Sequence, residues 1–108
     1  MTKITYIKSD DRMIIDIVGH TGFINEQTDV GCAAVSMLVS LLVTALRIED
    51  YCGHLEYLIF KKDSGDVKID FVPKAEYRDR LFVMTDTALL GFRILAEEYP
   101  DHVKFFDK

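Results

Sequence analysis

The sequence predicts an α+β fold in which two helices pack on a mainly antiparallel sheet, with the element order ββαββαβ. Short runs rich in β-branched and aromatic residues alternate with polar turn clusters, as in β-hairpins. Two longer segments have the apolar content and spacing of helices. The chain has 108 residues, of which 49% are hydrophobic and 29% charged, which is enough for one core. We therefore expect residues 1–108 to form a single domain.

The chain is expected to open with a β-hairpin. Lys3–Lys8 and Met13–Val18 are short strand-like runs rich in isoleucine, and the polar cluster Ser9–Arg12 separates them. Gly19 ends the second run. The connection from Gly19 to Thr28 has about ten residues, whereas roughly 2–6 residues usually join a strand to a helix. Long loops of this kind often carry functional residues.

A long helix is predicted from Thr28 or Asp29 to about Asp50, because either of the first two side chains can cap its free N–H groups. Small, weakly polar residues recur at every fourth position and form a ridge along one face: Cys32, Ser36, Ser40 and Thr44. The other faces are apolar, with Met37, Leu38, Leu41, Leu42 and Val43 among them. Two hairpins and one other helix do not fully cover these faces, so a homo-oligomer interface is expected.

The second half of the chain repeats the hairpin-then-helix plan. Leu55–Phe60 and Val67–Phe71 are expected to pair around the turn cluster Lys62–Gly65. The second of these runs alternates apolar and polar residues, which predicts a strand with one face in water. An amphipathic helix is expected from about Glu76 to Tyr99, and His102–Phe106 predict a short last strand.

Charge and cysteine content limit the partners and the compartment. A formal net charge of −5 argues against binding to nucleic acid phosphates or to an acidic membrane surface. The uncharged run from Val30 to Leu46 is interpreted as a core helix and not as a membrane span, because weakly polar residues interrupt it. The two cysteines form no Cys-x-x-Cys pair, and the N-terminal residues do not resemble a signal peptide, which favours the cytoplasm.

Cys32 and His20 are the candidate catalytic pair. Cys32 falls in the first turn of the predicted helix, where free N–H groups and the helix dipole favour a thiolate. His20 follows the second strand and would act as general base on the thiol and as general acid on a leaving amine. The first-turn N–H groups could also hold a developing oxyanion, and Gly19, Gly22 and Gly31 permit close backbone approach. The alternative interpretation of Cys32 is an inert core thiol.

Metal binding is the other chemistry that the histidines and cysteines could perform. His20, Cys32, Cys52 and His54 are residue types that bind zinc, but their spacing matches no zinc pattern known to us. We therefore expect neither a metal ion nor a cofactor.

Two motifs surround the candidate pair: Gly-His-x-Gly-aromatic at residues 19–23, and Asp-x-x-Cys-Ala-Ala-Val-Ser at residues 29–36. Together they resemble the bacterial ribosomal-processing cysteine proteases. The resemblance implies a homodimeric α+β endopeptidase that removes a short N-terminal extension from a large-subunit ribosomal protein, cutting after aromatic residues, during ribosome assembly. It assigns the catalytic histidine to His20 and the nucleophile to Cys32. The implied partner is a peptide segment, with no nucleic acid and no membrane.

Five further residues are expected to support the site or bind substrate: Gly19, Gly22, Phe23, Asp29 and Ser36. Asp29 either caps the helix or orients His20. Ser36, one turn beyond Cys32, either lines the site or packs as a small residue. Phe23 is the candidate for contact with an aromatic substrate side chain.

Several positions depart from the family pattern. Thr21 and Phe23 stand where the family usually has alanine and tyrosine, Gln27 replaces a glycine, and Gly31 replaces an aliphatic residue. The last two changes motivate an alternative function, a non-catalytic module of the same fold that binds ribosomal protein segments without cutting them. A third hypothesis is a thiol-redox or thioester-hydrolysing enzyme that uses the same activated Cys32.

Overall fold

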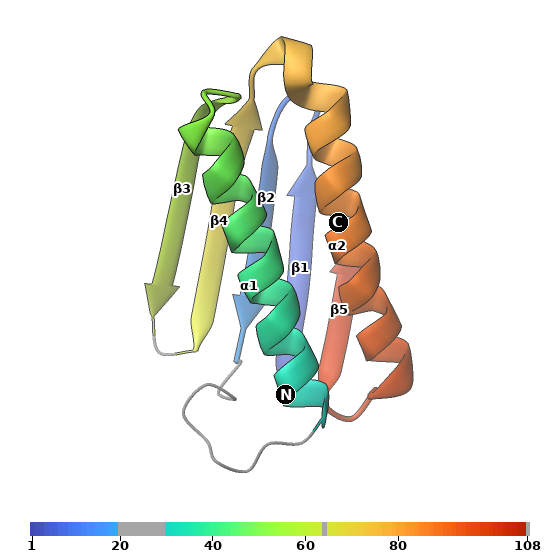
Figure 1. Ribbon diagram of the computed structural model, residues 1–108. Helices are drawn as coiled ribbons and strands as arrows, with labels where there is room; N and C mark the ends of the chain where they lie inside the picture. Colours follow the sequence, from blue (N-terminus) through green and yellow to red (C-terminus); the bar gives the residue numbers. More distant parts are fainter. Residues whose placement is uncertain (20–29, 64, 108) are drawn as a thin grey trace.

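The computed structural model describes residues 1–19, 30–63 and 65–107. For residues 30–32 and 107 it describes the backbone only. Within these ranges, five strands form one sheet in the order β3-β4-β2-β1-β5, and both helices cover the same face of it (Figure 1). In chain order the elements are β1 (Thr2–Lys8), β2 (Met13–Val18), α1 (Val30–Tyr51), β3 (Leu55–Asp63), β4 (Asp66–Pro73), the 3₁₀ turn η1 (Ala75–Tyr77), α2 (Arg78–Glu98) and β5 (Val103–Asp107). This confirms the predicted α+β class and the order ββαββαβ.

The sheet is antiparallel except at one edge. Strands β1 and β2 pair antiparallel, as do β2 with β4 and β3 with β4, whereas β5 lies parallel to β1. As a result the C-terminal end of β2, the β3–β4 turn and the start of α1 lie at the same end of the molecule (Figure 1). In the sequence, His20 follows the end of β2 and Cys32 lies at the start of α1. We therefore expect the site at this end of the molecule.

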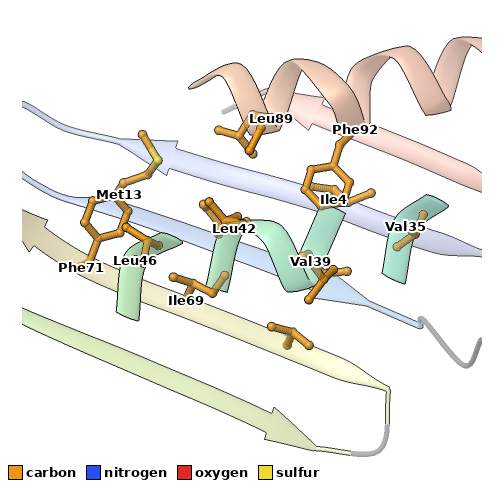
Figure 2. Packing of buried hydrophobic residues seen from close by; sticks show 14 of the residues in the cluster. Ile4, Met13, Val35, Val39, Leu42, Leu46, Ile69, Phe71, Leu89 and Phe92 are labelled. Atoms are coloured by element: carbon orange, nitrogen blue, oxygen red, sulfur yellow. The ribbon is translucent and has the colours of Figure 1, made fainter. Parts of the chain in front are cut away.

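The core lies between the sheet and the two helices. From α1 it receives Val35, Val39, Leu42 and Leu46, whose steps of four, three and four residues give one helical face. Figure 2 shows these side chains directed at residues of β1, β2 and β4, while Leu89 and Phe92 of α2 cover the region around Ile4. Burial of this apolar surface holds both helices on the sheet.

Several predicted boundaries shift. Strand β3 continues to Asp63, so Lys62 and Asp63, predicted as turn residues, belong to the strand. Strand β4 is also longer at both ends, and α2 is preceded by the 3₁₀ turn instead of starting at about Glu76. Cross-strand pairing extends both strands, because each backbone group gains a hydrogen-bond partner that local sequence signals do not reveal.

One predicted exposure is wrong. Alternation along β4 predicts Asp70 on a face in water, yet Asp70 is only 6% exposed. Arg12 covers it and donates hydrogen bonds from Nε and Nη2 at 2.9 and 2.6 Å, while the Tyr57 hydroxyl donates at 3.0 Å. The Arg12 hydrogen bonds hold the pKa of Asp70 below its ordinary value. The buried carboxylate thus has a charged partner, although the Arg12 side chain is itself 47% exposed.

The outer surface of the helical layer carries exposed apolar side chains, as the composition of the first helix predicts. Met37 is 67% exposed, Leu41 54% and Val83 65%. Between the helices runs an apolar groove of about 320 Å³ lined by Leu38, Leu41, Leu42, Ala45, Met84, Thr87 and Ala88. Although α1 has 22 residues, neither it nor any other helix in the described ranges is long and apolar enough to cross a membrane.

Candidate functional site

Cys32 is the third residue of α1, which begins at Val30. It therefore lies in the first turn, as predicted, where backbone N–H groups have no partner within the helix. A thiolate or an oxyanion at this position would meet those N–H groups and the positive end of the helix dipole. The Cys32 side chain and residues 20–29, which include His20, Gly22, Phe23 and Asp29, lie outside the described part of the structure.

Gly19, the residue before His20, is held on two sides. Its N–H donates to Oδ1 of Asp66 at 2.9 Å. Its backbone has φ of +81°, and a Cβ there would lie 2.5 Å from the carbonyl oxygen of Met1. Only glycine adopts this conformation without strain and fits this space. Gly19 therefore lies in close contact with the backbone of Met1.

Two residues of the polar ridge of α1, Ser40 and Thr44, face the edge strand β3. Ser40 and Thr44 line a groove of about 360 Å³ between the two elements, together with Arg47, Phe60 and Lys62. The Arg47 guanidinium lies 4.9 Å from the centre of the Phe60 ring. Weakly polar residues occur on this face of α1 because the groove leaves it open to water.

The same helical spacing relates the groove to the candidate nucleophile. Residue 32 belongs to the face of α1 that carries Ser36 and Ser40, since positions four apart share a face. Ser36, one turn from Cys32, is half-buried. Ser40 is eight positions from Cys32, which corresponds to about 12 Å along the helix axis. The groove, which Val39 also lines, therefore begins about two turns away from residue 32.

A second polar cluster lies at the opposite end of α1. Nδ1 of His54 is 2.6 Å from Oε1 of Glu49, and Nη2 of Arg80 donates to the same oxygen at 2.8 Å. The His54 ring stacks on Tyr77, with ring centres 3.9 Å apart. Hydrogen bonds from Arg80 and His54 lower the pKa of Glu49 to about 2. The cluster ties the end of α1 to the start of α2.

The length of α1 separates Cys32 from Cys52, two of the four residues of zinc-binding type. Cys52 follows the last residue of α1, and Cys32 stands in its first turn, so about 30 Å of helix lies between them. One metal ion cannot bind both thiols. In residues 1–19, 30–63 and 65–107, no group of three or more histidine, cysteine and carboxylate side chains could hold a metal ion.

The family model described as cysteine protease Prp matches residues 1–104. The chain belongs to the cysteine protease Prp family. The match covers every element of the fold up to the first residues of β5, including the first turn of α1 with Cys32. As a Prp family member the chain is a cysteine protease, which confirms the resemblance drawn from residues 19–36. No curated protein sequence matches the chain significantly.

Solved structures share the Prp fold along the whole chain. SMU.848 from Streptococcus mutans is 24% identical with a TM-score of 0.70, covering 100% of this chain and 96% of its own. The essential ribosomal processing protease Prp from S. aureus, in complex with a substrate peptide, is 17% identical with a TM-score of 0.68, and both chains are covered completely. The same S. aureus protease with a covalently linked product peptide is 19% identical, also with a TM-score of 0.68 and complete coverage of both chains. At these identities the likeness shows a common fold.

Proposed function

We propose that this protein is an endopeptidase that removes a short N-terminal extension from a large-subunit ribosomal protein during ribosome assembly. Cys32 is the nucleophile and His20 its general base. One observation carries the proposal: in a chain of the Prp family, Cys32 stands in the first turn of α1, where the backbone favours a thiolate. The peptides bound to the S. aureus Prp support a peptide as the substrate class.

The proposed reaction has two stages. His20 takes the proton from the Cys32 thiol, and the sulfur attacks the scissile carbonyl carbon. The N–H groups of the first turn of α1 hold the oxyanion, and His20 then gives its proton to the leaving amine as the C–N bond breaks. Water, deprotonated by His20, attacks the resulting thioester. The acyl peptide leaves as a carboxylic acid and Cys32 regains its proton.

Supporting roles follow from the order of residues along the chain. Asp29 directly precedes α1, which is the position of a helix cap. Gly19 sets the backbone that leads to His20. Ser36, one turn from Cys32, is proposed to line the site. Gly22 is proposed to allow close approach of the substrate backbone, and Phe23 to contact an aromatic substrate side chain.

The active molecule is proposed to be a cytoplasmic homodimer. The exposed apolar residues of both helices and the apolar groove between them support a second copy on this surface. The net charge of −5 favours association with a basic ribosomal protein chain. No direct contact with nucleic acid or membrane is proposed.

Cleavage of an extension-bearing ribosomal protein tests the proposal. We expect the wild-type protein to release the extension and to form a thioester that mass spectrometry detects. Cys32→Ala should abolish cleavage, and His20→Ala should lower kcat at least about 100-fold, because it removes the general base. Cys52→Ala is the matched control, since this exposed thiol lies at the far end of α1.

The result that would overturn the proposal is full cleavage by Cys32→Ala. Tight binding of the substrate by the wild-type protein without cleavage would instead support the binding-module alternative, to which Gln27 and Gly31 point. Hydrolysis of a model thioester without peptide cleavage would support the thioester-hydrolase alternative.

A further inference from the structure

The ladder between β2 and β4 is continued by a side chain. The last backbone pair of this antiparallel ladder is Ile17 with Val67. Beyond it, the Asp66 carboxylate accepts the N–H of Gly19 at 2.9 Å, a contact between residues 47 positions apart in the chain. Without Asp66 the end of β2 would have only water as a partner for this N–H group.

Gly19 is also restrained from the side of β1. The Met1 carbonyl oxygen approaches so closely that a Cβ on Gly19 would lie 2.5 Å from it. The adjoining amide, that of Thr2, donates to the His102 carbonyl at 2.8 Å, so this peptide plane is itself fixed. Gly19 is thus clamped between β4 and β1 at the last residue before His20.

We propose that Asp66 is a positioning residue for His20: its hydrogen bond fixes the backbone of Gly19, the residue that precedes His20 in the chain. This inference rests on the proposed function. Asp66 acts through the backbone and takes no part in the reaction. By fixing the Gly19 backbone it is proposed to raise the rate at which the proposed His20 and Cys32 pair reacts.

Three substitutions separate the hydrogen bond from the charge. Asp66→Ala removes both, whereas Asp66→Asn keeps an oxygen acceptor and removes only the charge. Asp63→Ala removes an exposed carboxylate that is paired with Asp66 at the end of the β3–β4 ladder, so it changes the charge of the same turn. All three are made in a Cys52→Ala background, so that Cys32 is the only thiol.

The experiment measures kcat and KM for peptide cleavage and the pH dependence of Cys32 alkylation by iodoacetamide. We expect Asp66→Ala to lower kcat about three- to tenfold with KM unchanged, the size of effect that one hydrogen bond allows. It should also slow alkylation at neutral pH, where the reaction depends on His20. Asp66→Asn should restore most of both rates, and Asp63→Ala should behave like the parent.

Wild-type kinetics and an unchanged alkylation profile in Asp66→Ala would overturn the inference. Equal losses in Asp66→Asn and Asp66→Ala would also overturn it, because the effect would then come from charge. Hydrogen exchange of the Gly19 amide tests the bond without catalysis: exchange should be faster in Asp66→Ala than in Asp66→Asn, and equal rates contradict the proposal. If the parent neither cleaves peptide nor shows His20-dependent alkylation, the proposed function is wrong. The hydrogen-exchange rates then still show whether Asp66 holds the Gly19 amide.

Discussion

Gly19 and Gly53 have nearly the same backbone conformation in different surroundings. Their φ angles are +81° and +80°, a region that side chains with a Cβ rarely adopt. A Cβ at Gly53 would meet nothing within 4 Å, whereas one at Gly19 would strike the Met1 carbonyl. The pair therefore separates the effect of conformation from the effect of contact.

We expect Gly53→Ala to lower the free energy of unfolding by about 1 kcal/mol, the conformational effect alone. Gly19→Ala should lower it by about 2–4 kcal/mol, because the carbonyl of Met1 is held by the Thr2 hydrogen bond and cannot easily move. Urea unfolding of both variants at pH 7 gives the comparison. Equal destabilisation would show that the contact with Met1 has no energetic effect.

At the scale of elements, the end of α1 is joined to the start of α2 by one carboxylate. Glu49 is largely buried at the side chain and binds both Arg80 and His54. Its pKa falls from 4.5 to about 2, chiefly through the Arg80 hydrogen bonds. Because the folded-state pKa is below the unfolded one, the unfolded chain binds more protons in this range, and stability falls as the pH is lowered.

Glu49→Gln should therefore be less stable than the parent by about 1–2 kcal/mol at pH 7, a value reduced by the exposure of Arg80. The difference should be constant above about pH 5 and shrink as the pH falls from 4.5 towards 2. Urea unfolding of both proteins at pH 7, 4.5 and 3 measures it. A difference independent of pH would mean that the lost contact is one of packing and not of charge.

Helix α1 has three faces in different surroundings. Val39 is buried against the sheet, while its neighbour Ser40 lines the groove beside β3. The third face, with Met37 and Leu41, is exposed and apolar. The ridge and the apolar faces follow from helical periodicity in the sequence. The positions of β3 and α2 decide which face of α1 packs on the sheet.

For the whole molecule, the exposed helical layer predicts the proposed dimer interface. Leu41→Lys should raise the dimer dissociation constant at least about tenfold, because it places a charge in an apolar contact. Ile7→Lys is the matched control: Ile7 is 51% exposed and alternates with residues that face the helices, so it lies on the other face of the sheet. Sedimentation velocity over a concentration series measures both.

Monomeric behaviour of the parent would contradict the dimer proposal. Equal weakening by both substitutions would move the interface away from the helices. A shift only in Ile7→Lys would place the second copy on the sheet face opposite α1 and α2.

Local sequence signals determined the element order, the helix that begins just before Cys32 and the glycine that ends β2, because periodicity and capping act over a few neighbouring residues. The motif at residues 19–36 also indicated the protease family that the comparison confirmed. Only the tertiary structure decided that Arg12 buries Asp70, and that Asp66 meets Gly19. These contacts join residues 58 and 47 positions apart, and they depend on strand register and on the order of strands in the sheet, which no local pattern specifies.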